Sequence, residues 1–298
     1  MEVPMKKIII VLCAFLMLGI VSTVASAMEY MAGAKAGYYA WQPFYKDLGA
    51  SGMSDIEWGD GVLYGPIISF IFTPQLSLSV AGLMGNQSTH WQSEFSDFDS
   101  STSTSGNYHF EVFRIDLDSA LSYRISESIR LFAGYKYLHM EVNYKYTELR
   151  TAIPNDNLTQ VIMEDIQSLV YSHGPAAGLG YSLPLSQHYF ISTNVSAVYM
   201  WGTIKSKGTQ EYEWSDFTNP PNQAPGEMPR TAIRQIGLNI EPSIGMSPGK
   251  GLPIITLGFR YQRFWVQFTE NTTESDPFPS KWLDDTMLGI FMSVVFMF

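Results

Sequence analysis

The most regular feature of the chain is an alternation of apolar and polar residues that recurs from about residue 30 to the last residue. In the sharpest case, apolar side chains stand at every second position with charged ones between them: Phe113, Ile115, Leu117, Leu121 and Tyr123 against Arg114, Asp116, Asp118 and Arg124. The same period of two appears over 76–80, 189–201, 236–241 and 255–262. Such a period predicts β-strands with one apolar and one polar face.

Strands and links together predict the fold class. We expect ten strands, at about 30–42, 61–72, 76–86, 108–124, 129–146, 168–183, 188–205, 231–246, 253–268 and 284–298. Short turns (73–75, 126–128, 184–187, 247–252) alternate with long links (43–60, 87–107, 147–167, 206–230, 269–283). This regularity is typical of an all-β, single up-and-down antiparallel transmembrane β-barrel with long extracellular loops and short periplasmic turns.

Segment lengths add two expectations. No apolar run of about 18 residues follows residue 27, so membrane-spanning helices are excluded from that part of the chain. About 9–11 tilted residues cross a bilayer as a strand, and several predicted strands are longer. Their surplus length should project from the membrane as a β-wall.

The first residues have the pattern of an export signal. Lys6 and Lys7 precede an apolar stretch over 8–24, and the small residues 25–27 follow it. We therefore expect a cleaved signal peptide over 1–27 and a barrel over 28–298, with a retained membrane helix as the alternative. Cys13, the one cysteine, lies within the signal and lacks a lipoprotein-type context, so the mature chain would have neither a disulfide nor a thiolate site.

Aromatic residues gather near strand ends, where an interfacial girdle of a barrel would place them. They are Tyr38, Tyr39, Trp41, Tyr123, Tyr135, Tyr137, Tyr181, Tyr199, Trp201, Tyr261 and Trp265. The alternative is that they are ordinary core aromatics. We expect outer-membrane lipid and lipopolysaccharide to surround the barrel.

The last strand ends in Phe298, in phase with Ile290, Met292 and Phe296. A C-terminal aromatic residue on such a strand resembles the signal that the barrel-assembly machinery recognises, so we expect this machinery as a partner through Phe298. The opposite face, which includes Met287 and Phe291, is also apolar, which indicates a crowded lumen.

Charge is distributed unevenly between loops and strands. The chain has 15% charged residues, a net charge of -10 and a pI near 4.9, which excludes nucleic-acid binding. The long links, with one flanking residue included at several ends, hold 18 acidic and 5 basic residues, whereas the rest of the mature chain is nearly neutral. An acidic outer face favours a cationic ligand.

Charged residues within the strands predict a network inside the barrel. We expect these side chains to face a narrow lumen: Lys35, Arg114, Asp116, Asp118, Arg124, Arg130, Lys136, Glu241 and Arg260, with Arg234 as a weaker candidate. A barrel of about eight strands is filled by its own side chains. The charges would then form a paired polar plug, or alternatively line a selective, porin-like conduit for small solutes.

The segment Thr73-Pro74-Gln75-Leu76-Ser77-Leu78-Ser79-Val80-Ala81-Gly82 resembles a turn and strand of the omptins, ten-stranded outer-membrane proteases of Gram-negative-type bacteria. A weaker similarity lies at Leu131-Phe132-Ala133-Gly134-Tyr135. The resemblance implies a bacterial outer-membrane location and catalysis by an Asp-x-Asp pair and an Asp-x-His pair. The second pair has no histidine here. A displaced endopeptidase site would use His90, Asp97, Asp99, Glu213 and Asp216.

We expect no cofactor and no metal. His109, His139, His173 and His188 are scattered without the spacing of metal ligands, and no calcium-type ladder of carboxylates occurs. The favoured function is that of a non-enzymatic barrel that binds a ligand at its surface or passes small solutes. An omptin-like endopeptidase is the alternative, and a secreted soluble β-sandwich is a third class.

Overall fold

The computed structural model describes residues 29–48, 58–96, 102–152, 159–214, 222–227, 230–249, 251–269 and 282–298. Its elements are β1 (Glu29–Gln42), the 3-10 helix η1 (Phe44–Leu48), β2 (Gly59–Ile71), β3 (Leu76–Ser96), β4 (Thr102–Arg124), β5 (Ile129–Ala152), β6 (Thr159–Pro184), β7 (Tyr189–Trp214), β8 (Asn222–Glu227), β9 (Thr231–Met246), β10 (Ile254–Phe268) and β11 (Leu283–Met297). Within these ranges no helix is both long and apolar enough to span a bilayer. The expected export signal lies outside the described residues.

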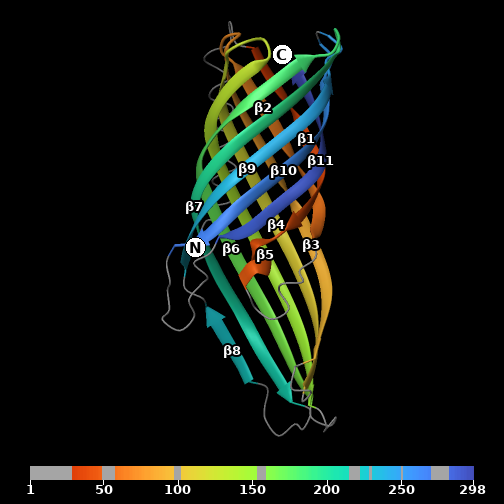
Figure 1. Cartoon of the computed structure of the whole chain (residues 1–298), viewed down its shortest axis with the longest axis vertical. Coiled ribbons are helices and arrows are strands. Elements are labelled where there is room, and N and C mark those ends of the chain that lie inside the picture. The colour runs from red at the N-terminus through yellow and green to blue at the C-terminus, as the bar shows by residue number, and fades with distance from the viewer. Residues whose placement is uncertain are drawn as a thin grey trace, which may run out of the picture.

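Ten of the strands close into a barrel. Each strand from β1 to β7 pairs with the next, β7 pairs with β9, and β9, β10 and β11 follow in order. The ring closes because β1 and β11 pair antiparallel from Met31 opposite Met297 to Gln42 opposite Thr286. β8 lies outside the ring and pairs with β7 alone in the described part of the chain. The predicted up-and-down barrel of ten strands is confirmed (Figure 1).

One end of the barrel carries only short connections, as expected of the periplasmic end. The turns over 72–75, 125–128, 185–188 and 247–253 all lie there. Phe298 lies at the same end, where its ring stacks on Tyr30 with centroids 5.1 Å apart and its backbone N–H donates to the Tyr30 carbonyl at 2.9 Å. The chain end therefore completes the seam between β1 and β11.

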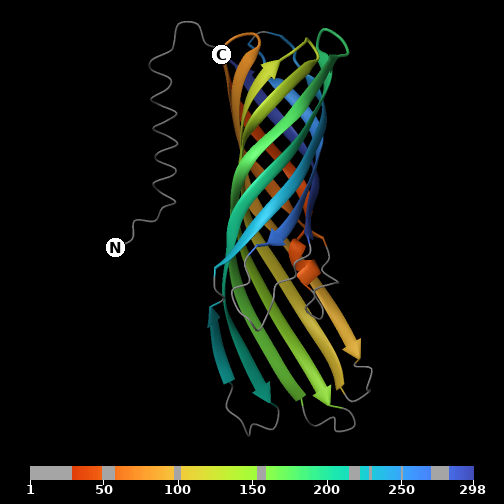
Figure 2. The same cartoon turned by 60° about the vertical axis from the view of Figure 1, so that its left-hand side comes forward.

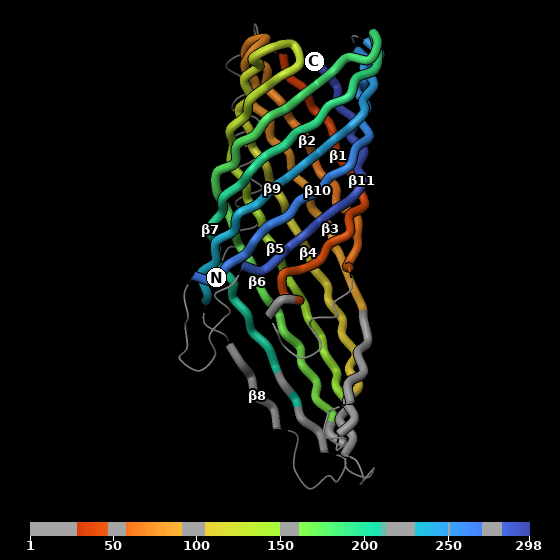
Figure 3. The backbone as a smooth tube through the Cα atoms, viewed as in Figure 1, coloured from red at the N-terminus to blue at the C-terminus, as the bar shows by residue number. Residues whose placement is uncertain are grey.

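The other end is asymmetric because β3 to β7 are much longer than the remaining ring strands. They have 21 to 26 residues, against 13 to 16 in β1, β2, β9, β10 and β11. Figures 1 and 2 show the surplus projecting as a curved sheet beyond the barrel, and the tube in Figure 3 follows the same course. We call its parts, 86–96, 102–111, 141–152, 159–167 and 205–214, the wall. The expectation of a projecting β-wall is confirmed.

The outward faces of the strands change character where the wall begins. On β3 the outward positions are apolar up to Met84, and then polar at Asn86, Ser88 and His90. The apolar part spans nine residues from Leu76, the length of a strand that crosses a bilayer. Outward-facing, exposed apolar side chains surround the rest of the ring: Val62, Leu117, Leu121, Leu131, Leu179, Ile191, Ile236, Leu257, Ile290 and Met292.

The aromatic girdle is present with two corrections. Tyr38, Tyr135, Tyr181, Tyr199 and Trp201 are among the exposed aromatic residues on the outside of the barrel. Tyr39 and Trp41 instead point inward and are 0% and 1% exposed. They belong to the opposite face of β1 from Tyr38, since side chains alternate along a strand.

Candidate functional site: the barrel lumen

A continuous chain of ion pairs crosses the lumen near the middle of the membrane-spanning region. We call it the charge belt; its members are Lys35, Arg114, Asp116, Asp118, Lys136, Glu241 and Arg260. They come from β1, β4, β5, β9 and β10. All are buried except Asp118 and Glu241, which are partly exposed. The belt therefore joins most of the charges that the sequence places in the lumen.

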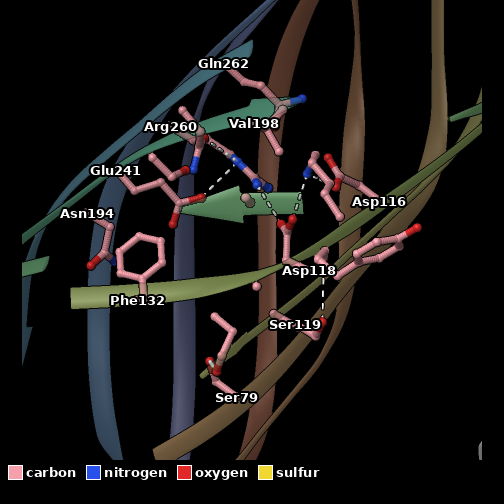
Figure 4. A pocket seen from close by; sticks show the side chains of 18 of the residues that line it. Ser79, Asp116, Asp118, Ser119, Phe132, Asn194, Val198, Glu241, Arg260 and Gln262 are labelled. Carbon is pink, nitrogen blue, oxygen red and sulfur yellow. Dashed lines mark hydrogen bonds and ion pairs between the residues drawn. The ribbon is translucent and has the colours of Figure 1, made fainter. Parts of the chain in front are cut away.

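Arg260 is the centre of the belt. Its Nε donates to Glu241 Oε1 at 2.8 Å, and one Nη donates to Asp118 Oδ2 at 3.1 Å (Figure 4). Glu241 also accepts from Lys35 Nζ at 3.0 Å. In the ring of ten strands, β10 and β4 are five positions apart in either direction, so the contact between Arg260 and Asp118 joins opposite sides of the barrel.

Lys136 and Arg114 continue the belt on the β4–β5 side. Lys136 Nζ donates to Asp118 Oδ1 at 2.9 Å and also contacts Asp116. Arg114, with no exposed side-chain surface, lies 3.5 Å from Asp116 Oδ2. Four cations thus face three carboxylates, and each carboxylate contacts at least two cations. Buried charges are tolerated when they are paired in this way.

A cavity of about 210 Å³ extends from the periplasmic side of the belt past its charges to Leu83, Val198 and Phe264. Small and polar side chains, among them Ser79, Asn194 and Ser196, line much of its periplasmic part. Figure 4 shows Asp118, Glu241 and Arg260 of the belt among the residues that line it. Arg130 reaches across Gly180 to donate to Asn194 Oδ1 at 2.8 Å; a Cβ on Gly180 would lie 2.3 Å from its Nε. Gly180 is therefore what leaves room for this guanidinium.

Two of the predicted lumen charges lie outside the belt. Arg124 and Arg130 face each other across β4 and β5 at the periplasmic end, and both line a second cavity of about 270 Å³. Neither has a carboxylate partner among the described residues. Arg234, the weaker candidate, is on the outer surface with its guanidinium 5.1 Å from the Trp282 ring, because it lies on the opposite face of β9 from Glu241.

On the extracellular side of the belt the lumen is filled by large apolar and aromatic side chains. We call this part the apolar layer: Tyr39, Trp41, Phe44, Leu63, Leu83, Phe110, Leu138, Met140, Met200, Ile233, Phe264, Val266, Leu283 and Met287. Met287 and Phe291 are buried, in agreement with the crowded lumen predicted for the last strand. The aromatic rings pack on one another, as Trp41 does on Phe110 with centroids 5.9 Å apart.

Several polar side chains lie among the apolar layer: Gln87, Gln235, Gln262 and Asp285 are buried, and each has an atom without a hydrogen-bond partner among the described residues. Trp41 Nε1 donates to the buried carboxylate of Asp285 at 3.1 Å. Burial raises the pKa of the Tyr45 phenol on η1 and that of the Tyr144 phenol in the wall, so both hydroxyls stay protonated. Large packed side chains thus occupy much of the lumen on the extracellular side of the belt.

Sequence reasoning recognised packing in the lumen for the last strand alone, and elsewhere missed the apolar layer because it assigned apolar residues to the lipid face. The signal is clearest in β11, where Met287 and Phe291 on the inner face alternate with Leu288, Ile290 and Met292 on the outer one. Two apolar faces on one strand indicate lipid on one side and a packed interior on the other.

The residues proposed for a displaced peptidase site are only partly described. His90 lies on β3 with its side chain exposed on the outer face, whereas its neighbour Thr89 is buried. Glu213 lies on β7, opposite Val161 of β6. Asp97, Asp99 and Asp216 are outside the described residues. The one placed histidine of this set therefore faces away from the lumen over which the site was expected to converge.

Comparisons with known proteins give structural matches only. No protein-family model matches the sequence, and no curated protein does. The outer membrane protease OmpT of Escherichia coli matches with a TM-score of 0.45 and 8% identity over 92% of this chain and 98% of that chain. The translocator domain of the autotransporter NalP of Neisseria meningitidis gives 0.33 and 9% over 97% and 95%. CarO of Acinetobacter baumannii gives 0.29 and 12% over 86% and 95%.

The architecture of the barrel itself indicates that it lies in a membrane. A closed ring of strands has no unpaired edge, and its outward face is apolar over the length of a bilayer crossing. The chain is a bacterial outer-membrane β-barrel. Its ten-strand plan is the omptin-like plan expected from the sequence.

Proposed function

We propose that the protein is a closed, non-enzymatic outer-membrane barrel that binds a ligand at its outer surface. The proposal of a closed lumen rests on one observation, the ion pair of Arg260 with Asp118. One Nη of Arg260 lies 3.1 Å from Asp118 Oδ2, and the pair joins opposite sides of the ring. The apolar layer lies directly beyond this contact. A hydrated solute would have to break buried ion pairs and then cross packed aromatic side chains, and each of these steps costs several kcal/mol.

The wall and the acidic links support the binding role. Five long strands extend beyond the membrane although the barrel needs no such length to cross it. The ranges predicted as long links, which the structure divides between the wall and the loops on this side, hold 18 acidic residues against 5 basic ones. A rigid sheet that carries acidic loops favours a cationic ligand or a cationic surface of a partner.

Planar-bilayer recording of the refolded protein tests the closed lumen. We expect no unit conductance in salts of small or large ions at moderate voltage, while an open porin inserted in the same chamber conducts. A stable unit conductance of the purified barrel would favour the alternative of a narrow conduit for small solutes.

The endopeptidase alternative has its own test. Digestion of a mixed peptide library by the folded barrel, at pH values between about 5 and 8, should yield no cleavage products. Reproducible cleavage that is lost in the His90→Asn variant would establish the displaced peptidase site instead.

A further inference from the structure

We propose that His90 and His109 on the outer face of the wall form a binding site for a divalent transition-metal ion, with zinc as the reference ion. The two histidines are 19 residues apart in sequence, and the register of β3 and β4 places them directly opposite each other. Their Nδ1 atoms are 3.5 Å apart. The site belongs to the wall and does not depend on whether the lumen conducts.

The distance between the two nitrogens fits a shared metal better than a direct hydrogen bond. Hydrogen bonds that involve N–H donors usually have donor–acceptor distances of about 2.7–3.2 Å, so 3.5 Å is long for one. Two imidazole nitrogens that bind one tetrahedral zinc at about 2.0–2.1 Å are roughly 3.3–3.4 Å apart. A movement of a few tenths of an ångström would therefore bring both nitrogens into the coordination sphere.

Glu111 provides the outer support that a metal-binding histidine usually has. Its Oε1 lies 3.1 Å from Nε2 of His109, the ring nitrogen that faces away from His90. When Nε2–H donates to this carboxylate, Nδ1 of His109 carries a free lone pair directed at His90. A carboxylate in this position fixes the tautomer and ring orientation and raises the basicity of the ligand nitrogen.

The surroundings leave the site open to water and to metal. His90 and Glu111 are exposed and His109 is partly exposed, on strands whose outward positions have become polar at this height. Ser88 lies opposite Glu111, and Lys145 lies opposite His109 with Asp165 beyond it on β6. Asp165 is the cross-strand neighbour of Lys145, so a negative charge accompanies the lysine beside the site.

The protein supplies two ligands, and water completes the coordination sphere. Among the described residues no group of three or more His, Cys, Asp or Glu side chains could hold a metal. Imidazole suits zinc, copper and nickel, whereas magnesium and calcium prefer oxygen ligands. The two histidines should therefore bind zinc and copper, and they should add nothing to the affinity of the protein for magnesium.

Isothermal titration of the untagged, refolded barrel with Zn²⁺ tests the proposal. We expect one zinc ion per barrel, with at least a tenfold loss of affinity in His90→Asn and in His109→Asn. Glu111→Gln should lose about tenfold, the lower end of the effect of removing a carboxylate that supports a metal ligand. His188→Asn, in an exposed turn at the periplasmic end, is the matched control and should bind zinc as the wild type does.

A measurement on the unaltered chain avoids any effect of substitution on folding. Zinc should protect His90 and His109, and not His188, from modification by diethyl pyrocarbonate, as read by mass spectrometry of peptides. The proposal is overturned if both histidine variants bind zinc as the wild type does, or if zinc leaves all three histidines equally reactive. It is also overturned if zinc binds no more tightly than magnesium, because the acidic loops alone would then account for the binding.

Discussion

The charge belt predicts a large difference between two substitutions that each remove one carboxylate from an ion pair. Glu241→Gln removes an acceptor whose side chain is only 15% exposed and that serves both Lys35 and Arg260. Asp284→Asn removes the partner of Arg263 in a surface pair whose side chains are 34% and 37% exposed. Both substitutions replace a carboxylate by an amide, so the burial of the ion pair is what the comparison tests.

The structure sets the magnitudes. Lys35 is 10% exposed on its side chain, and Glu241 is its only ion-pair partner in the described part of the chain. Removing one member of a buried pair leaves an uncompensated charge and typically costs about 3–5 kcal/mol. The belt would change from four cations and three carboxylates to four and two. For the surface pair we expect less than about 1 kcal/mol, because water and salt already screen it.

The assay is equilibrium unfolding in urea with barrels reconstituted in lipid vesicles, followed by tryptophan fluorescence. We expect Glu241→Gln to lower the free energy of unfolding by at least about 3 kcal/mol, and Asp284→Asn to leave it nearly unchanged. Equal free energies for the two variants would refute the reasoning, since the belt would then contribute no more than a surface ion pair.

Three further substitutions test the packing of the lumen, the lipid face and the chain end. Gly237→Ala should destabilise the barrel by about 1–3 kcal/mol, because its Cβ would lie 2.1 Å from the Phe264 ring, whereas Gly82→Ala, with no atom nearer than 3.6 Å, should be neutral in the same unfolding assay. Leu257→Arg places a charge at an outward position that is 57% exposed, and should cost about 2–4 kcal/mol in vesicles; an unchanged stability would mean that this face does not meet lipid. Deletion of Phe298 removes the stack on Tyr30 and should lower the amount of heat-modifiable, folded barrel in the membrane fraction, and an undiminished yield would show that this residue is dispensable for assembly.

The alternation of apolar and polar residues predicted the membrane-spanning strands well, because lipid on the outer side requires an apolar residue at every second position. β9 (Thr231–Met246) and β10 (Ile254–Phe268) match their predicted ranges to within one residue. Beyond the bilayer this constraint disappears, and both faces of a strand can be polar. For that reason β3 runs to Ser96 and β6 begins at Thr159, about ten residues past the predicted ends.

Contacts between distant residues could not be predicted from periodicity. The sequence identified Asp118 and Arg260 as lumen residues, but their contact follows from the number of strands and the closure of the ring. The pairing of His90 with His109 depends on the register of β3 and β4, and the alternation of residue types within each strand does not specify that register. The apolar layer was missed because a packed lumen and a lipid face use the same residue types.

Single-cysteine labelling from the two sides of the membrane tests the sealed lumen most directly. The sequence has one cysteine, Cys13, within the expected export signal, so introduced cysteines would be the only ones in the mature chain. Ser196 lines the cavity on the periplasmic side of the charge belt, and Ser88 is exposed on the outer face of the wall. A membrane-impermeant maleimide should label Ser88→Cys from the outside, and Ser196→Cys only from the periplasmic side. Rapid labelling of Ser196→Cys from the outside would contradict a closed barrel.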